Sequence, residues 1–459
     1  MLFSSISFIY YFLLLFLIIY FITPSKYRNF IILLFSLLFY FLGEPKYIIV
    51  LIISCILNYV FSLLIDKRKH AKLYLVLACI YNIGQLLVFK YTDFFIGNIN
   101  NIIGSNIPFM YIVMPIGISF FTFQALGYVI DVYKGKHKPA KNIWDFTAYV
   151  SLFPQLVAGP IVRYSDIEHD LRERTTSFSK FSEGIKRFTI GLGKKVLFAN
   201  VLGEVATLLT ETSVLASWLK PILYTLQIYF DFSGYSDMAI GIGLMIGFRF
   251  LENFNYPLTA SSITDFWRRW HMSLSSWFRD YVYIPLGGNR VSTIKFIRNI
   301  FVVWFLTGFW HGASWNFILW GLYFGVLLVI EKFFLKKYID KTKVLKYIYT
   351  SVIVVISFLI FSVEDFNLII TELKNMFFIS GVPLTDKITL YYLKSYIILF
   401  IVSIIGATPL MSKLVGRIKQ TKGRVVIDIL EPVFYILLLV ISTAFLIDAS
   451  FNPFLYFRF

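Results

Sequence analysis

The chain has 459 residues, of which 58% are hydrophobic and only 15% are charged. No soluble fold of this length is so apolar, and repeated charge-free runs of about 17 to 25 residues are long enough to cross a bilayer core of about 30 Å as helices. The net charge of +17 comes from Lys and Arg residues in short loops between these runs, a positive-inside pattern that predicts no nucleic-acid partner. We therefore predict an all-α polytopic membrane protein in contact with membrane lipids.

The first apolar run, Phe3 to Ile22, is predicted to be a retained helix. It lacks the basic leading region and the small-residue cleavage site of a secretory signal, and further spans follow it. Cys55 and Cys79 lie in apolar runs, where cysteines behave as small hydrophobic residues. They indicate no disulfide, metal site or thiol nucleophile.

The basic loops set the predicted topology and domain organisation. Every second loop is basic, at residues 26–28, 66–72 and 134–141, which places the N-terminus outside the cytoplasm. The last spans alternate across the basic loop 413–424 and leave the C-terminus outside as well. We expect residues 1–459 to form one membrane domain, with N-terminal spans in 1–141, a motif-bearing core with re-entrant segments in 142–330 and C-terminal spans in 331–459.

The apolar segment Ile143 to Pro160 has basic residues at both borders, although one full crossing would place its borders on opposite faces. Pro154 and Pro160 both interrupt a helix. We therefore predict a re-entrant segment buried within protein. Gln155, near its bend, would then line an interior surface.

The apolar run Trp218 to Phe248 carries two carboxylates near its middle. Carboxylates inside a span usually mark a water-filled or substrate-lined path. Capping of a helix break near Gly234 by Ser233 and Asp237 is the alternative. The residues predicted to line the path are Asp231, Ser233, Tyr235 and Asp237.

The stretch Thr264 to Tyr283 is rich in tryptophan and arginine. Thr264 can cap a helix on which aromatic residues and His271 recur at helical spacing. Such an amphipathic helix would lie at the cytoplasmic interface and needs no substrate. The functional alternative is that its arginines bind the phosphates of an anionic donor. These predicted donor-binding residues are Arg268, Arg269 and Arg279.

The segment Asn299 to Ile330 contains no Asp, Glu, Lys or Arg, and His311 is its one group that titrates near neutral pH. An ionisable side chain at membrane depth is a functional candidate, and histidine is suited to acid–base chemistry. A hydrogen bond from His311 to a neighbouring helix carbonyl is the structural alternative. Gly308 and Gly312 would let another backbone or a ligand approach, or serve helix packing alone.

The sequence allows two paths for this segment through the membrane. Arg298 and the loop 331–346 are both basic, so the segment would return to the side that it left. A hairpin that bends near the glycines satisfies this pattern. A long tilted single span is the alternative, and it would break the charge rule at this loop.

Several blocks, in this order, resemble the membrane-bound O-acyltransferase superfamily, in particular its bacterial alginate and peptidoglycan O-acetyltransferase branch. The resemblance covers nearly the whole chain. The blocks span residues 114–124 (MPIGISFFTFQ), 153–161 (FPQLVAGPI), 231–237 (DFSGYSD), 265–271 (DFWRRWH), 310–312 (WHG) and 452–459 (NPFLYFRF).

The resemblance implies a fold and an active site. The fold would be a ring of about 10–12 transmembrane helices with re-entrant segments around a central tunnel. His311 matches the essential histidine of the superfamily, and His271 matches a second histidine of the bacterial branch. The donor would be acetyl-CoA, a substrate and not a bound cofactor, and the turn at residues 285–290 resembles the acetyl branch more than the D-alanyl branch.

Acyl transfer from a thioester needs a base for the acceptor hydroxyl and donors for the developing oxyanion. His311 can serve as the base, while His271, Asn316 or a backbone N–H polarises the carbonyl. His271 can equally orient or relay, or be structural. Trp310 and Asn316 are predicted to line the tunnel, and we expect no metal ion.

Three functions remain in competition. The first is a cross-membrane acetyltransferase in the bacterial cytoplasmic membrane, acting on an extracellular or cell-wall polysaccharide through an extracytoplasmic partner resembling SGNH hydrolases. D-alanyl or another acyl group is a variant of it. The second is a proton-coupled transporter or flippase that uses Asp231, Asp237 and His311. The third is a scaffold in which His311 and His271 are dispensable.

Overall fold

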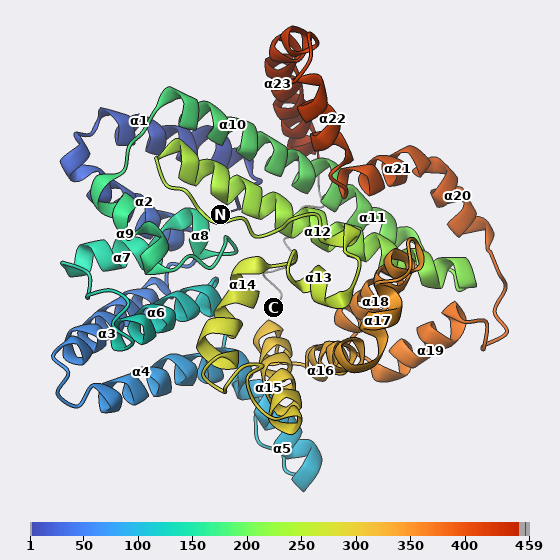
Figure 1. Cartoon of the computed structure of the whole chain (residues 1–459), viewed down its shortest axis with the longest axis horizontal. Coiled ribbons are helices and arrows are strands. Elements are labelled where there is room, and N and C mark those ends of the chain that lie inside the picture. Colours follow the sequence, from blue (N-terminus) through green and yellow to red (C-terminus); the bar gives the residue numbers. More distant parts are fainter. Residues whose placement is uncertain (1, 449–454, 456–459) are drawn as a thin grey trace. The chain divides into compact units, whose positions relative to one another are not determined.

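The computed structural model describes residues 2–448 and residue 455. The regular elements in this part of the chain are all helices, which confirms the predicted fold class (Figure 1). The chain forms two compact units, each described by itself below. Unit 1 comprises residues 2–188 and 236–252, and unit 2 comprises residues 189–235, 253–448 and 455. The predicted division at residues 141 and 330 stays a prediction.

Six helices within the described residues are long and apolar enough to cross a bilayer. A pair of helices bent by 62° at Tyr396 would give a seventh span. The polytopic prediction is therefore confirmed, although about 10–12 spans were expected. The difference arises because several charge-free runs form shorter helices, such as Ser7–Ile22 and Ile118–Tyr133. The six candidate spans are Ser25–Gly43, Ile48–Asp66, Ala71–Ile103, Trp315–Ile339, Leu345–Ser362 and Arg424–Asp448.

Polar side chains join the packed helices of unit 1. Asn58 on α3 and Asn82 on α4 exchange amide hydrogen bonds of 2.7 and 3.2 Å, and Gln85 on α4 donates to Thr122 on α6 at 2.7 Å. Buried amide pairs of this kind hold helices together in a membrane. The hydrophobic effect does not drive helices together there, because lipid tails are as apolar as the helix surfaces. The helices that lie wholly in unit 1 are α1 (Leu14–Ile22), α2 (Arg28–Gly43), α3 (Ile48–Asp66), α4 (Ala71–Leu86), α5 (Thr92–Ile103), α6 (Ile118–Tyr133), α7 (Ile143–Ser151), α8 (Phe153–Leu156) and α9 (Tyr164–Glu173).

The predicted re-entrant segment consists of two short helices, α7 and α8, separated at Leu152. Pro154 stands in the first turn of α8, where its missing N–H costs no hydrogen bond. Gln155 is fully buried, and its amide donates to the carbonyl of Tyr149 at 2.6 Å. The segment thus forms no single long helix, and its depth in the bilayer stays a prediction.

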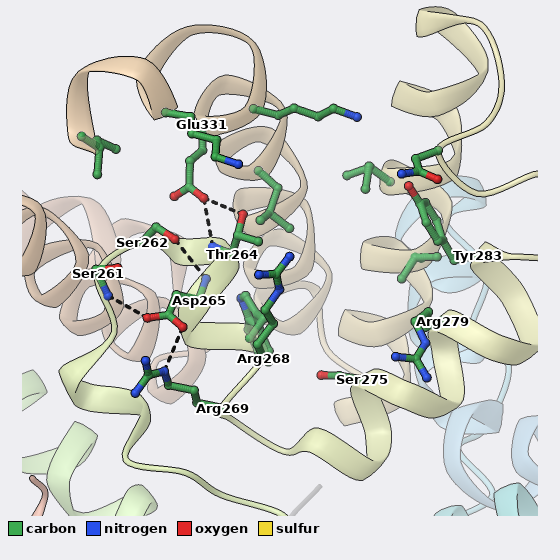
Figure 2. A pocket seen from close by; sticks show the side chains of 18 of the residues that line it. Ser261, Ser262, Thr264, Asp265, Arg268, Arg269, Ser275, Arg279, Tyr283 and Glu331 are labelled. Atoms are coloured by element: carbon green, nitrogen blue, oxygen red, sulfur yellow. Dashed lines mark hydrogen bonds and ion pairs between the residues drawn. The ribbon is translucent and has the colours of Figure 1, made fainter. Parts of the chain in front are cut away.

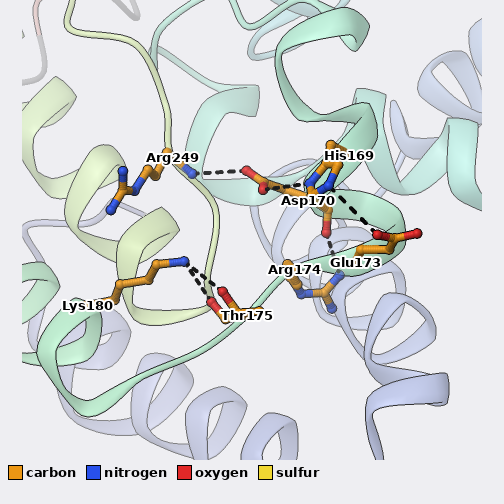
Figure 3. Close-up of polar contacts among 7 residues, drawn as sticks. All are labelled: His169, Asp170, Glu173, Arg174, Thr175, Lys180 and Arg249. Atoms are coloured by element: carbon orange, nitrogen blue, oxygen red, sulfur yellow. Dashed lines mark hydrogen bonds and ion pairs between the residues drawn. The ribbon is translucent and has the colours of Figure 1, made fainter.

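The polar stretch that follows forms α9 and the start of α10 (Phe178–Gly193). Figure 3 shows how its side chains tie neighbouring segments together. The Asp170 carboxylate accepts the backbone N–H of Arg249 at 3.3 Å, and Lys180 donates to the carbonyl of Thr175 at 2.9 Å. Arg174 also donates to the Tyr20 hydroxyl on α1 at 2.8 Å. This stretch therefore forms helices that hydrogen bonds tie to neighbouring segments of unit 1.

Helix α12 (Val214–Met245) begins in unit 2 and ends in unit 1, and it passes through Gly234 without interruption. The helix break that the sequence offered as an alternative at this glycine is therefore wrong. A Cβ at Gly234 would lie 2.7 Å from the carbonyl oxygen of Gly191 on α10, so the glycine allows close helix packing. The other helices of unit 2 are α11 (Val201–Leu208), α13 (Ile263–Trp267), α14 (Met272–Phe278), α15 (Thr293–His311), α16 (Trp315–Ile330), α17 (Lys336–Ile339), α18 (Leu345–Ser362), α19 (Phe366–Met376), α20 (Lys387–Ser395), α21 (Ile397–Gly406), α22 (Leu410–Ile418) and α23 (Arg424–Asp448).

Helices α15 and α16 form an antiparallel hairpin whose turn is at residues 312–314 (Figure 1). A Cβ at Gly308 would clash with the carbonyl of Phe317, and a Cβ at Gly321 would clash with the carbonyl of Trp304. The two glycines therefore let the backbones touch. Of the two paths left open by the sequence, the hairpin is correct and the single long span is wrong.

The Gly321→Ala variant is expected to destabilise the hairpin. Its new methyl group meets backbone atoms, which cannot rotate away, so we expect a loss of about 1–3 kcal/mol. The measurement is the melting temperature in detergent, followed by size-exclusion chromatography. The matched control is Gly416→Ala on α22, where a Cβ meets nothing within 4 Å. Equal melting temperatures for both variants and the wild type would contradict this prediction.

Candidate active site

His311 is the last residue of α15 and is 3% exposed. Its ring lies among three aromatic side chains, at centroid distances of 5.0 Å from Trp310, 5.0 Å from Trp320 and 5.4 Å from Phe361. The helix ends there because the backbone at Gly312 is extended. The hairpin turn therefore fixes the imidazole at one end of two packed helices.

Asn316 positions Phe361, one of the three rings around His311. It lies in the first turn of α16, and its amide donates to the carbonyls of Ile360 at 3.3 Å and Phe361 at 2.9 Å. These bonds attach the end of α18 to the start of α16. The structure thus places Asn316 close to the His311 enclosure, as predicted, with its amide nitrogen engaged in positioning Phe361.

His271 lies between α13 and α14 in the left-handed conformation, with φ of +43°. It is 1% exposed, and burial lowers its pKa to about 3, so its imidazole is neutral near pH 7. Its ring centroid is 4.7 Å from that of Phe232 and 6.0 Å from that of Trp310. Trp310 therefore contacts both predicted catalytic histidines, which the structure brings to one place.

The prediction of one amphipathic helix starting at Thr264 is wrong. Ser262 caps α13 by accepting the N–H of Asp265 at 3.0 Å, and the helix stops at Trp267. The chain bends because Asn253 accepts the N–H of Met272 at 3.0 Å through its backbone carbonyl. A non-glycine residue held at positive φ, such as His271, is strained and is typical of functional sites.

A cavity of about 880 Å³ lies in unit 2 beside this bend (Figure 2). All three predicted donor-binding arginines line it, from α13 to the segment after α14. Arg269 pairs with Asp265 at 2.8 Å and Arg279 pairs with Asp280 at 2.7 Å, whereas Arg268 makes no ion pair within the described residues. Arg268 is therefore the arginine best placed to meet a ligand phosphate.

The opposite wall of the cavity adds two lysines that the sequence analysis missed. Lys332 and Lys336 lie four residues apart beyond the end of α16, on one helix face. That spacing within a basic loop was the available signal. Cations outnumber carboxylates among the lining residues, so the cavity favours an anion. The cations are Arg268, Arg269, Arg279, Lys332 and Lys336, and the carboxylates are Asp265, Glu331 and Asp340.

Comparison with known proteins places this arrangement in a family. The family described as MBOAT, membrane-bound O-acyltransferase, matches residues 141–371. The chain is 41% identical to the probable alginate O-acetylase AlgI of Azotobacter vinelandii, over 84% of this chain and 80% of that protein. The chain belongs to the membrane-bound O-acyltransferase family.

Two further relatives extend the match. The probable alginate O-acetylase AlgI of Pseudomonas putida is 37% identical over 100% of both chains. The peptidoglycan O-acetyltransferase of Helicobacter pylori is 35% identical over 84% of this chain and 81% of that protein. The protein is therefore an acyltransferase, and the resemblance stated from its motifs is confirmed. The last of those motifs, at residues 452–459, lies outside the described residues except for Leu455.

The acyltransferase also contains a buried carboxylate beside the cavity that the sequence analysis did not single out. Glu331 is 3% exposed and accepts hydrogen bonds from the N–H of Ile263 at 2.7 Å, the N–H of Thr264 at 3.0 Å and the Thr264 hydroxyl at 2.5 Å (Figure 2). A carboxylate at a helix N-terminus satisfies donors that have no partner inside the helix. Glu331 thus fixes α13, and with it Arg268, against the end of α16.

The Glu331→Ala variant is expected to lose about 2–3 kcal/mol of stability, because the buried N–H of Ile263 and the partly buried N–H of Thr264 lose their acceptor. The measurement is the melting temperature of the purified acyltransferase. The control is Glu204→Ala on α11, an exposed glutamate whose side chain accepts no hydrogen bond within the described residues. A Glu331→Ala protein that melts like this control would contradict the capping role.

The remaining predicted site residues are divided between the units. Asp231 is paired with Lys195 at 2.8 Å in unit 2, where Ser233 and Tyr235 are also buried. Asp237 is paired with Arg187 at 2.7 Å in unit 1, which also contains Gln155. The structure therefore brings together His311, His271, Trp310 and Asn316, and the assignment of the other residues to one tunnel stays a prediction.

Proposed function

We propose that this acyltransferase moves acetyl groups from cytoplasmic acetyl-CoA across the membrane for O-acetylation of an extracellular or cell-wall polysaccharide. The names of its relatives, alginate O-acetylase and peptidoglycan O-acetyltransferase, support the acetyl group and the class of acceptor. The observation that carries the proposal is one hairpin with His311 at its turn and a cationic cavity at its other end. Phosphates of the donor bind at the cavity while the thioester reaches the histidine.

In this proposal His311 is the general base. It takes the proton of the attacking hydroxyl as the oxygen bonds to the thioester carbonyl carbon. The carbon–sulfur bond then breaks, and His311 returns that proton to the sulfur, so that CoA leaves as the thiol. His271, neutral because of its burial, can donate a hydrogen bond to the developing oxyanion. Trp310 lies against both rings and keeps them at the same place.

The setting is the bacterial cytoplasmic membrane, with an extracytoplasmic partner protein resembling SGNH hydrolases that completes transfer to the polymer. The basic loops between the spans support this orientation, because they mark the cytoplasmic side. The transporter alternative gains no support from the carboxylates, since Asp231 and Asp237 are both ion-paired in the structure. A proton path needs carboxylates that can exchange protons.

The test uses the purified protein in lipid vesicles supplied with acetyl-CoA and a soluble sugar acceptor. We expect release of free CoA that requires the protein and increases with the acceptor, together with acetyl esters on the sugar. A matched reaction with D-alanyl thioester tests the variant acyl group. Uptake of an intact substrate without CoA release would overturn the proposal.

A further inference from the structure

Two buried indole N–H groups lie between the cavity and His311. Trp267 lines the cavity and is 8% exposed, and Trp320 is 1% exposed. The Nε1 atom of each is buried and has no hydrogen-bond acceptor within the described part of the chain. An indole N–H can only donate, and burying it without an acceptor destabilises a folded protein. Two such groups at neighbouring positions call for an acceptor that the described residues do not supply.

The two indoles form a continuous contact from the cavity to the histidine. The ring centroid of Trp267 is 5.5 Å from that of Trp320, which is 5.0 Å from that of His311. Trp320 also belongs to one face of α16, because residues four apart on a helix share a face. Phe324, four residues further along, shares that face, and its ring centroid is 5.3 Å from that of Trp320 and 4.9 Å from that of Trp267.

Elsewhere in unit 2 an indole with a structural role has its acceptor. The Nε1 of Trp218 on α12 donates to the carbonyl of Met376 at 2.9 Å. Buried polar groups in folded proteins are nearly always paired in this way. Trp267 and Trp320 depart from that pattern, and they do so on the line that joins the cationic cavity to His311.

The order of chemical groups along a CoA thioester fits the order of the cavity, the two tryptophans and His311. Its phosphates are anionic, its acyl group is at the opposite end, and two secondary amides stand between them on the pantetheine arm. With the phosphates at the cavity lysines and arginines and the thioester at His311, both amides fall beside the two tryptophans. Each amide carbonyl is an acceptor of the kind that an indole N–H needs.

We propose that Trp267 and Trp320 bind the pantetheine arm of the donor by donating hydrogen bonds to its two amide carbonyls. Trp320, beside His311, takes the amide nearer the thioester. Trp267, in the cavity wall, takes the amide nearer the phosphates. This assignment rests on the proposed function. Two hydrogen bonds at fixed positions along the arm place the thioester carbonyl beside the histidine.

The test compares Trp267→Phe and Trp320→Phe, which keep an aromatic ring and remove the N–H. Each is expected to lower kcat/KM for acetyl-CoA by about three- to tenfold, the usual value of one neutral hydrogen bond. The second donor is S-acetyl-N-acetylcysteamine, which keeps only the amide nearer the thioester. With it, Trp320→Phe is expected to show the same loss and Trp267→Phe none.

Stability separates this role from packing. Because each substitution removes a buried donor that has no acceptor, both variants are expected to melt at or above the wild-type temperature. The control is Trp218→Phe, which loses the bond to Met376 and is expected to melt lower with kcat/KM unchanged for both thioesters.

Wild-type kcat/KM in Trp320→Phe, or an equal loss on both donors in Trp267→Phe, would overturn this proposal alone. Melting below the wild type with unchanged kinetics would also overturn it. A wild-type protein that turns over neither thioester would overturn the proposed function, and this assignment with it.

Discussion

The His311→Gln and His311→Ala variants are expected to lose acetyl transfer by a factor of about 10² to 10⁴, the contribution usual for a general base. Neither glutamine nor alanine can take the hydroxyl proton, whereas the surrounding rings of Trp310, Trp320 and Phe361 remain. The measurement is the acceptor-dependent release of CoA by protein in vesicles. Glutamine is the more decisive replacement, because it fills most of the space of the imidazole.

A matched control separates the chemistry from folding. His169 is an exposed histidine on α9, so His169→Gln is expected to keep wild-type turnover and melting temperature. The double variant His271→Gln with His311→Gln is expected to lose little more than His311→Gln alone, because residues that act as a unit are not additive. A His311→Gln protein that keeps more than about a tenth of the wild-type rate would sink the general-base role, which predicts at least a hundredfold loss.

The position of His311 could be predicted because the relevant signals are local. A charge-free run with one histidine and two glycines four apart is visible in the sequence, and the hairpin turns at residues 312–314, directly after His311. Arg298 and the basic loop after Ile330 favoured a segment that returns to the side that it left, with a single span as the alternative. What stayed open was the choice between a hairpin and one span, since it depends on backbone contacts such as Gly321 with Trp304.

The bend at His271 could not be predicted, because it depends on partners that are distant in the sequence. Helical spacing from Thr264 to Trp277 favoured one helix, but the carbonyl of Asn253 holds the N–H of Met272 and stops it. Glu331 caps α13 from 67 residues away, as measured to Thr264. Single-sequence periodicity records neither contact, so tertiary structure overrides it here.

The partners of the two carboxylates of α12 could not be predicted from the sequence either. The sequence showed two acids inside an apolar run, and a path or a helix break was the natural interpretation. The structure keeps the helix continuous and gives each acid a cation, Lys195 for Asp231 and Arg187 for Asp237. Both cations stand on the chain before α12, and no local sequence pattern links them to the acids.

The ion pair of Lys195 with Asp231 gives the prediction with the largest effect on stability. Both side chains are buried, 2.8 Å apart, and Asp231 also accepts the N–H of Leu455 at 2.9 Å. Lys195→Met removes the cation and leaves a buried carboxylate with no countercharge among the residues that the structure describes. We expect a loss of about 3–5 kcal/mol, measured as a lower melting temperature in detergent or as loss of the monodisperse protein.

The double variant Lys195→Met with Asp231→Asn is expected to recover most of that loss. It removes both charges, and the new amide oxygen can still accept the N–H of Leu455. Because replacing both members of a buried pair is often nearly neutral, the recovery isolates the uncompensated charge as the cause. If the recovered protein also turns over acetyl-CoA at the wild-type rate, Asp231 is structural and the substrate path excludes it. If Lys195→Met alone melts like the wild type, the pair contributes nothing to the fold and this account of α12 is wrong.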